Sequence, residues 1–276
     1  LHDALPIYAH THPYISTGLK ENKFGIDIAL APAVYQRATQ LPGLDIVGVD
    51  CHIGSQITEV SPYLDALGKL IDLIKALADQ GIALKHLDLG GGIGIRYTDE
   101  TPLTPSDLLS RVFQALDSNN LGHLQIVLEP GRSLVGNAGV LLTRVEYLKH
   151  NDTKNFAIVD AAMNDLLRPT LYDAWHGVET VRQRETSGPI CRYDVVGPIC
   201  ESGDWLARDR ELRIEPGDLL AIMSAGAYAF SMASQYNSRP RPAEIMVDGT
   251  TAHVVRQRET VPSLFANEQT IPVRPA

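Results

Sequence analysis

The chain has 276 residues and 44% of them are hydrophobic, so it can bury the core of one large domain or two medium ones. Its formal net charge of −9 argues against nucleic acid or an anionic membrane as the main partner, because either would select a basic surface. The charge favours a small-molecule ligand instead. Three cysteines without a CxxC pair favour a reducing cytoplasm, and no apolar stretch is long enough to cross a bilayer.

The first half of the chain alternates strand and helix signals, which predicts a parallel sheet with crossover helices. Three apolar runs are typical of strands, at residues 45–51, 86–89 and 125–128. Each is followed at once by a loop of turn and polar residues, and these loops are His52–Ser55, Gly90–Gly92 and Glu129–Arg132. Since α/β enzymes keep their chemistry at the carboxyl ends of strands, we expect the three loops to bind a ligand.

Two helices are predicted between these strands. The first is expected to begin with Ser61 as its N-cap and Pro62 in the first helical position, and to end near Gly81. Its apolar residues recur three or four positions apart, at Leu64, Leu67, Ile71, Ile74 and Leu77. The second is expected to open at Ser106, and its apolar face is Leu108, Leu109, Val112, Phe113 and Leu116.

After Gly136 the pattern changes to short runs with the two-residue period of β-strands. These runs are residues 140–148, 156–159, 192–196, 218–223 and 244–247. Asp248-Gly249, ahead of a further run at 250–255, predicts a hairpin. We therefore expect an α/β domain over residues 1–134 and a β-sandwich or barrel-like domain over residues 135–276. A complete (β/α)8 barrel needs about 250 residues, so the first domain is expected to be the C-terminal part of a TIM-type barrel.

Two of the strand-end loops indicate ligand binding from their own residues. The backbone N–H groups of Gly90–Gly92 could approach a phosphate without interference from a Cβ atom, with a tight turn as the alternative. A dinucleotide-binding G-x-G-x-x-G motif is disfavoured, because Ile95 stands where the third glycine is required. Glu129 ends an apolar run, so a buried carboxylate there would need a cationic partner, either a ligand or Arg132.

Five motifs follow one another along the chain: His52-Ile-Gly-Ser55, Gly90-Gly-Gly92, Glu129-Pro-Gly-Arg132, Cys200-Glu-Ser-Gly-Asp204 and Ala225-Gly-Ala-Tyr228. In this order they closely resemble the fold-type III decarboxylases that use pyridoxal phosphate. The similarity runs from Thr11 to about Phe265 and includes residues 12–18 and 23–25. The family's cofactor-bonding lysine lies in an N-terminal Tyr-Ala-x-Lys-Ala motif, which this chain lacks. The resemblance therefore implies the C-terminal two-thirds of such an enzyme, inactive alone.

The resemblance implies that pyridoxal 5′-phosphate is the cofactor. Glu129 would pair with the ring nitrogen and keep it protonated, which deepens the electron sink for the pair left by departing CO2. His52 would stack on the ring face and take part in catalysis. The other implied cofactor contacts are Ser55, Gly90, Gly91, Gly92, Gly131, Arg132 and Tyr228. In isolation, a core histidine and a turn hydroxyl are the commoner interpretations of His52 and Ser55.

The same resemblance implies a set of substrate residues. They are Arg132, Arg168, Tyr172, Glu201 and Tyr228. The substrate that the resemblance implies is meso-2,6-diaminopimelate. It carries an amino-acid group at both ends, so its site must satisfy a distal ammonium and a distal carboxylate. Glu201 and Arg168 supply one group of each sign. Cys200 would return a proton to the carbon that loses CO2, although on the residues alone Arg168 is typical of a solvated arginine and Cys200 of inert packing.

The implied reaction is the decarboxylation of meso-2,6-diaminopimelate to L-lysine, the last step of lysine biosynthesis. An ornithine- or arginine-type decarboxylase or an alanine-racemase-like enzyme is the alternative within the enzyme class, and a non-enzymatic decarboxylase-like binding or regulatory protein is the alternative outside it. In the family, the loop that carries Cys200 reaches the neighbouring subunit, so the resemblance implies a homodimer with shared active sites. No metal is expected, since His10 and His12 lack a third ligand.

Overall fold

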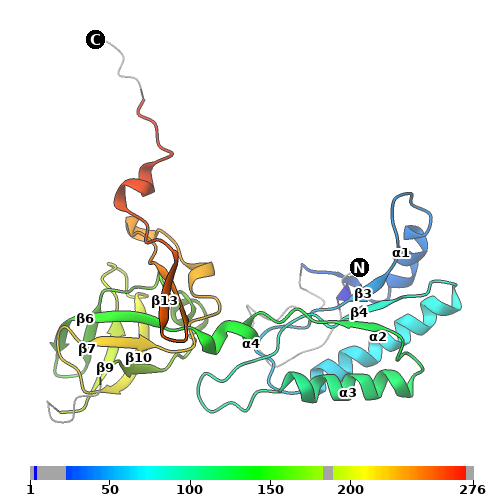
Figure 1. Ribbon diagram of the computed structural model, residues 1–276, viewed down its shortest axis with the longest axis horizontal. Coiled ribbons are helices and arrows are strands. Elements are labelled where there is room, and N and C mark those ends of the chain that lie inside the picture. The colour runs from blue at the N-terminus through cyan, green and yellow to red at the C-terminus, as the bar shows by residue number, and fades with distance from the viewer. Residues whose placement is uncertain (1–2, 5–22, 183–188, 272–276) are drawn as a thin grey trace. The chain divides into compact units, whose positions relative to one another are not determined.

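The computed structural model describes residues 3–4, 23–182 and 189–271 (Figure 1). Contacts within the chain divide it into two units, with the boundary between Ala138 and Gly139. Within the described residues, no helix is both long and apolar enough to cross a membrane. The motif at residues 12–18 and the histidine pair His10 and His12 lie outside the described residues.

The first unit contains a three-stranded parallel sheet in the order β3-β4-β5. Gly48 pairs with His86 and His86 pairs with Gln125, so the three strands are in register and their carboxyl ends share one edge. The three predicted strands are confirmed, each shorter than its apolar run. Their bounds are β3 Gly48–Asp50, β4 His86–Asp88 and β5 Gln125–Val127. A parallel pair precedes them along the chain, β1 (Asp3–Ala4) and β2 (Ile26–Asp27).

Helices connect the strands of this sheet, as predicted from the alternating pattern (Figure 1). The helix between β3 and β4 is α2, Ser61–Asp79, and the helix between β4 and β5 is α3, Pro105–Ser118. A shorter helix, α1 (Ala31–Ala38), precedes β3, and the single turn α4 (Arg132–Val135) follows β5. Each parallel strand therefore returns through a crossover helix, which leaves every strand end at the same edge of the sheet.

The predicted N-caps of both helices are wrong by one or two residues. Val60 caps α2 without a side-chain hydrogen bond, and Ser61 is already helical. Thr104 caps α3, where its side-chain oxygen accepts a hydrogen bond of 3.1 Å from the backbone N–H of Asp107, and Ser106 lies inside the first turn. A proline is tolerated at more than one position of a first turn, so its presence does not by itself locate the cap.

The core of the first unit lies between the two longer helices and the sheet. Leu67, Leu70 and Leu77 of α2 are buried there, and each buried leucine contributes roughly 1.5–3 kcal/mol. The predicted apolar face of α3 is confirmed at its centre but not at Phe113, which is 48% exposed. Tyr63 of α2 is buried, which raises the pKa of its hydroxyl. That hydroxyl donates a hydrogen bond of 2.9 Å to the backbone oxygen of Gly91, so the helix is tied directly to a strand-end loop.

The second unit is built on a six-stranded mixed sheet in the order β10-β9-β7-β6-β11-β8. All neighbouring strands are antiparallel except β7 and β9. The two edge strands contact each other, and Arg210 of β10 donates a 3.1 Å hydrogen bond to the backbone oxygen of His176, so the sheet curves back on itself. The strand bounds are β6 Leu141–His150, β7 Asn155–Val159, β8 Val178–Thr180, β9 Cys191–Val196, β10 Trp205–Leu212 and β11 Leu219–Ile222.

Two strands of this sheet, β8 and β10, are missing from the prediction. The β8 strand has only three residues, too few to show a period. The β10 strand contains the charged run Arg208–Glu211, and its pairing with β9 is interrupted by register shifts, with Asp209 at a φ of 57°. A bulge of this kind breaks the alternation of apolar and polar residues from which a strand is predicted.

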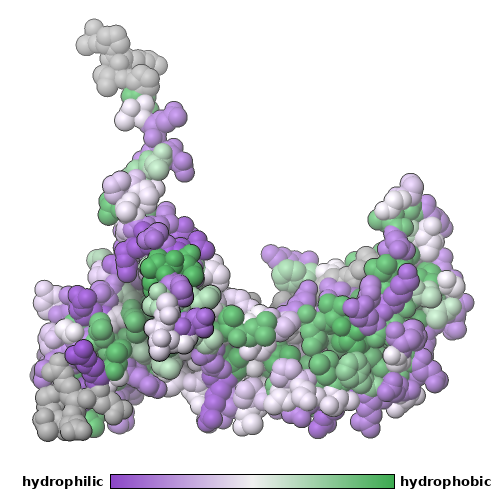
Figure 2. Space-filling view, in the orientation of Figure 1, coloured by the Kyte–Doolittle hydropathy of each residue, from purple (hydrophilic) through white to green (hydrophobic). Residues whose placement is uncertain are grey.

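A separate hairpin follows the sheet, as predicted. Its strands are β12 (Glu244–Asp248) and β13 (Thr251–Arg256). Asp248 pairs with Thr251, so the two loop residues are Gly249 and Thr250, one residue later than expected. Every residue of the two strands except Glu244 is exposed, and Figure 2 shows hydrophobic surface in this region. Four short helical turns complete the unit: α5 Arg168–Tyr172 and the 3-10 turns η3 Phe230–Met232, η4 Tyr236–Ser238 and η5 Val261–Phe265.

Candidate functional site

Three loops of the first unit leave the same edge of the parallel sheet. Backbone hydrogen bonds continue between them beyond the strands, from Cys51 N–H to Asp88 O at 3.1 Å and from Glu129 N–H to Gly90 O at 2.8 Å. The glycine loop therefore lies between the other two. The structure brings together these predicted loops, which we call the strand-end loops: His52–Ser55, Gly90–Gly92 and Glu129–Arg132.

The three consecutive glycines allow the neighbouring backbones to approach each other. Gly90 has a φ of +68° and Gly92 a φ of +92°, a region that side chains disfavour. A Cβ atom at Gly90 would lie 2.5 Å from the backbone oxygen of Cys51, and one at Gly91 would collide with the backbone oxygen of Glu129. The glycines are thus required by the contact between loops, in addition to any contact with a ligand.

The N–H groups of the glycine loop are only partly available to an anion. Gly90 N–H donates to the carboxylate of Asp88 at 2.8 Å, and Gly91 N–H donates to Nδ1 of His52 at 3.2 Å. Among the hydrogen bonds of the described residues, none is donated by the N–H of Gly92. Of the three N–H groups that were expected to bind an anion together, that of Gly92 is therefore the one still available among the described residues.

The hydrogen bond from Gly91 also determines the state of His52. Because Nδ1 accepts this hydrogen bond, the neutral ring carries its proton on Nε2. The ring is half-buried and anchored at one nitrogen to the glycine loop. An imidazole held in this way has a fixed orientation, which suits contact with a flat ligand.

Glu129 is exposed, so the expectation of a buried carboxylate is wrong. It follows β5, which is an edge strand of the three-stranded sheet and has exposed residues at both ends. The backbone of Glu129 nevertheless lies against Gly91, since a Cβ built on that glycine would be 3.8 Å from the Cβ of Glu129. The backbone of Glu129 is thus held against the glycine loop, and its carboxylate is accessible to a ligand.

Arg132 is buried at the start of α4 and is held by two side chains. Its Nη1 donates to the Tyr97 hydroxyl at 2.5 Å, and its Nη2 donates to Oγ of Ser55 at 3.0 Å. The guanidinium also lies 5.8 Å from the centre of the Tyr97 ring. Because Ser55 accepts from the arginine, its own hydroxyl proton can be donated to another acceptor. Tyr97 has no motif around it, so sequence reasoning missed this contact.

In the second unit, Arg168 opens the short helix α5 and is buried at 6% exposure. Its Nη1 lies 2.8 Å from Nε2 of His176, a residue with no exposed surface. Tyr172 lies one helical turn after Arg168, on the same face of α5. The expectation of a solvated arginine is wrong, and sequence reasoning missed His176, whose only signal is a histidine in Trp175-His-Gly177.

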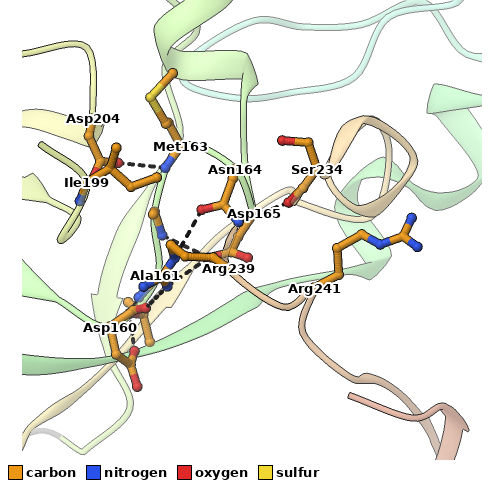
Figure 3. A network of polar contacts seen from close by, with 12 residues as sticks. Asp160, Ala161, Met163, Asn164, Asp165, Ile199, Asp204, Ser234, Arg239 and Arg241 are labelled. Atoms are coloured by element: carbon orange, nitrogen blue, oxygen red, sulfur yellow. Dashed lines mark hydrogen bonds and ion pairs between the residues drawn. The ribbon is translucent and has the colours of Figure 1, made fainter. Parts of the chain in front are cut away.

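The loop that carries Cys200 and Glu201 is fixed by a buried carboxylate. Asp204 accepts hydrogen bonds of 2.7 Å from the backbone N–H groups of both Met163 and Ile199 (Figure 3). Burial raises the pKa of Asp204, against the opposing effect of these two hydrogen bonds. Asp204 therefore joins the cysteine loop to the segment that leads into Arg168, a role that its place in the Cys200–Asp204 motif does not reveal.

A second set of polar contacts fixes the same segment from the other side (Figure 3). Arg239 donates to the backbone oxygen of Asp160 at 2.6 Å and to Oδ1 of Asn164 at 3.3 Å. Asn164 in turn donates through Nδ2 to the backbone oxygen of Ser234 at 3.1 Å. Buried polar groups satisfied in this way specify one arrangement of the loops that they connect.

Glu201 lines a cavity of about 270 Å³ in the second unit. The hydroxyl of Tyr236 donates to Oε2 of Glu201 at 2.5 Å, and this hydrogen bond raises the pKa of the tyrosine. Cys200 is exposed, so its thiol is open to a reaction partner. The other residues that line the cavity are Met163, Asn164, Leu167 and Ser234.

Tyr228 has a backbone φ of 60°, which is rare for a bulky residue. Strain of this kind persists only where the surrounding structure requires it, and it is common at ligand sites. The side chain is partly exposed. Within the described residues, no group of three histidine, cysteine, aspartate or glutamate side chains is placed to hold a metal ion.

Comparison with known proteins gives concordant matches. The family described as pyridoxal-dependent decarboxylase, pyridoxal binding domain, matches residues 3–136. The diaminopimelate decarboxylases of Pseudomonas aeruginosa and Vibrio cholerae are 59% and 52% identical to the chain. Each match covers 96% of this chain and 62% of the relative, so the chain spans about 62% of the length of these curated relatives.

Solved structures agree with these matches. The diaminopimelate decarboxylase of Helicobacter pylori, complexed with L-lysine, has a TM-score of 0.90 and 43% identity over 96% of this chain and 65% of that one. The enzyme of M. jannaschii in co-complex with L-lysine has a TM-score of 0.90 and 37% identity over 98% of this chain and 63% of that one. These similarities extend through both units. The chain is therefore similar to pyridoxal-dependent decarboxylases over 96% of its length, and residues 3–136 match their pyridoxal binding domain.

Proposed function

We propose that this chain carries cofactor- and substrate-binding residues of a diaminopimelate decarboxylase, which converts meso-2,6-diaminopimelate to L-lysine and CO2. The observation that carries the proposal is the identity of 52–59% with diaminopimelate decarboxylases over 96% of the chain. Identity falls to 24% for the lysine/ornithine decarboxylase of Vibrio vulnificus complexed with cadaverine. A substrate that keeps a carboxylate in its product is therefore favoured over ornithine.

Pyridoxal 5′-phosphate is the proposed cofactor, and the donor set of the strand-end loops fits its phosphate. The Ser55 hydroxyl, the Gly92 N–H and the Arg132 cation are all donors, as an anion requires. A Cβ built at Gly131 meets no atom within 4 Å, so there is open space beside the last loop. Gly90 and Gly91 shape the loop through backbone contacts, and Tyr228 is a further proposed contact.

The residues at the same edge also fit the pyridine ring. Glu129 presents an exposed carboxylate that can accept a hydrogen bond from the ring nitrogen and hold a proton there. His52, fixed by Gly91, packs on the ring face. When bound, the protonated ring withdraws the electron pair left by departing CO2.

The second unit supplies the proposed substrate contacts. Arg168 binds a carboxylate, which suits a guanidinium already held in one orientation. Glu201 binds the distal ammonium group, and the cavity beside it can accept the end of a short chain. Cys200 returns a proton to the substrate carbon. Tyr172 is a further contact, supported by its place one turn from Arg168.

The proposed assembly is a homodimer in which each site uses residues of both copies. It is supported by the exposed position of Cys200, on a loop fixed at its base by Asp204. The first unit is proposed to be part of a (β/α)8 barrel, on the evidence of three in-register parallel strands that return through helices. The proposed location is the cytoplasm, and its support is that all three cysteines are free, as is usual in a reducing compartment.

A fusion protein tests the proposed reaction. The portion of the Pseudomonas aeruginosa enzyme that this chain does not match is joined to the 264 residues of this chain that do match, and CO2 release is measured from diaminopimelate and from ornithine. We expect release from diaminopimelate alone, because Arg168 and Glu201 together match its distal end. The same fusion with Cys200→Ala is expected to lose about 100-fold in rate, the usual contribution of a positioned proton donor.

Two controls make the result decisive. Cys191→Ala in the same fusion changes a half-buried cysteine of β9 and should leave the rate unchanged. Faster release from ornithine than from diaminopimelate would contradict the proposed substrate. A fusion that folds and binds pyridoxal phosphate but releases CO2 from neither compound would support the non-enzymatic alternative.

A further inference from the structure

His176 is a buried titratable residue that the proposed reaction does not use. It has no exposed surface and lies just before β8, between Arg168 and the end of β11. Nε2 of its ring is 2.8 Å from Nη1 of Arg168, and Nδ1 is 2.8 Å from the backbone oxygen of Met223. Both nitrogens of the imidazole are thus engaged, each by a different part of the unit.

The chemistry of these two partners assigns the tautomer of the ring. A carbonyl oxygen can only accept, so Nδ1 of His176 carries the proton and donates it to Met223. A guanidinium can only donate, so Nε2 is unprotonated and accepts from Arg168. These two hydrogen bonds require a neutral imidazole, because a second proton, on Nε2, would face the arginine cation.

The backbone around His176 is held on both sides. Met223 N–H donates to the backbone oxygen of Gly177 at 2.8 Å, and Arg210 donates to the backbone oxygen of His176 at 3.1 Å. The Arg210 guanidinium also stacks 4.5 Å from the centre of the Trp175 ring. These contacts leave the imidazole one position, so the nitrogen that faces Arg168 is fixed relative to the sheet.

We propose that His176 is a positioning residue that sets the orientation of Arg168 for recognition of a carboxylate. An arginine side chain is long and flexible, and a bidentate contact requires its planar fork to face the ligand. The hydrogen bond to His176 removes this freedom before the ligand arrives. The inference rests on the proposed function, since it takes Arg168 as the carboxylate ligand of the substrate.

Two substitutions separate the two hydrogen bonds of the ring. His176→Asn places an amide where Nδ1 stands, so it can keep the bond to Met223 but cannot reach Arg168. His176→Gln places an amide oxygen where Nε2 stands, so it can still accept from Arg168. His150→Leu is the matched control, because it removes a histidine of the same unit that contacts the Tyr193 hydroxyl at 3.0 Å and not Arg168.

The readout is the ratio of affinities for L-lysine and cadaverine, measured by calorimetry on the 276-residue chain with pyridoxal phosphate present. Cadaverine is L-lysine without its carboxylate, so only the lysine affinity depends on Arg168. We expect His176→Asn to reduce the preference for lysine by about tenfold, the value of a charge-assisted hydrogen bond. His176→Gln and His150→Leu should stay within about twofold of the original preference.

A change in folding alone would weaken both ligands together and leave their ratio unchanged. An unaltered ratio in a folded His176→Asn variant would therefore overturn the inference. If the original chain binds neither ligand, it is the proposed function that fails.

A measurement on the unaltered protein covers the case in which the asparagine variant does not fold. The nitrogen resonances of the His176 ring should show an unprotonated Nε2 and a protonated Nδ1, and the Nε2 resonance should respond to lysine but not to cadaverine. The opposite tautomer, or an equal response to both ligands, would overturn the inference.

Discussion

The two units hold their candidate residues in different ways. In the first unit, the strand-end loops follow directly from hydrogen-bonded parallel strands, and backbone contacts such as Glu129 N–H to Gly90 O continue the sheet into the loops. In the second unit, Arg168 and Tyr172 lie on α5 and Cys200 and Glu201 on the cysteine loop, and buried side chains hold both segments. The difference shows that strand order can place a loop, whereas an irregular segment needs specific polar partners.

The largest expected effect comes from the backbone packing of the first unit. Gly91→Ala puts a Cβ atom against the backbone oxygen of Glu129, which cannot move without displacing β5. We expect a loss of about 3 kcal/mol in the free energy of unfolding, together with loss of pyridoxal phosphate binding. Urea denaturation and a fluorescence titration of the cofactor check both results.

The control for this substitution is another glycine of the same unit. Gly68→Ala lies in α2, where an added Cβ meets no atom within 4 Å, and alanine favours a helix by about 1 kcal/mol over glycine. It should leave stability unchanged or raise it. Equal losses at the two positions would show that close backbone contact does not hold the strand-end loops.

The next effect concerns the buried carboxylate of the second unit. Asp204→Asn replaces one of two acceptors with an amide NH2, which faces the backbone N–H of Met163 or Ile199. The unsatisfied donor should cost about 1–3 kcal/mol in the free energy of unfolding. Because the cysteine loop is then held less firmly, alkylation of Cys200 should become faster. Thermal denaturation and a thiol-modification assay measure the two changes.

Asp209→Asn is the matched control for Asp204. Asp209 lies on β10, is exposed and pairs with Arg192 at 3.3 Å, so its substitution should cost less than about 1 kcal/mol. It should leave the alkylation rate of Cys200 as it was. If Asp204→Asn also left this rate unchanged, the carboxylate would stabilise the fold without positioning the cysteine loop.

A smaller effect is expected at the cavity of the second unit. Tyr236→Phe removes only the hydroxyl that donates to Glu201, so the carboxylate loses one orienting contact. We expect affinity for L-lysine to fall by about threefold, with no measurable change in stability, since an exposed hydrogen bond contributes little. Tyr147→Phe, at a residue of β6 that is 70% exposed, should change neither quantity. Calorimetry of lysine binding distinguishes the two variants.

The smallest effect is a pH dependence in the second unit. Hydrogen bonds from Arg241 and Gln235 lower the pKa of Glu259 from 4.5 to about 2. A lowered pKa means that the stabilisation is present above pH 4.5 and is lost as the pH falls toward about 2. Arg241→Ala should return the titration midpoint of Glu259 toward 4.5, measured by NMR. A midpoint near 4.5 in the unaltered protein would contradict the contact.

The sequence predicted the elements of the first unit more fully than those of the second. Helix α2 has a long 3.6-residue pattern and β3, β4 and β5 are compact apolar runs, so each was recognisable without tertiary information. Strand β10 was not predicted, because a bulge at Asp209 and a run of charged residues break the alternation of apolar and polar side chains. The N-caps were wrong because a proline fits several positions of a first turn.

The candidate residues divide in the same way. The strand-end loops could be predicted, since each motif directly follows an apolar run. The exposure of Glu129 could not, because it depends on β5 being an edge strand, and the order of strands is absent from the local pattern. Tyr97, His176 and Tyr236 could not be found either, since each acts on a residue 8 to 35 positions away.

By itself, the sequence determined the kinds of element, the three loops at the ends of parallel strands, and the motifs that mark the family. The tertiary structure alone decided which donors are already used, which carboxylates are open, and which side chains hold Arg168, Arg132 and Cys200 in place. The physical reason is the distance along the sequence over which each kind of interaction acts. Periodicity, turn residues and caps act over a few positions, whereas the availability of a buried polar group depends on partners that only the folded chain brings within hydrogen-bonding distance.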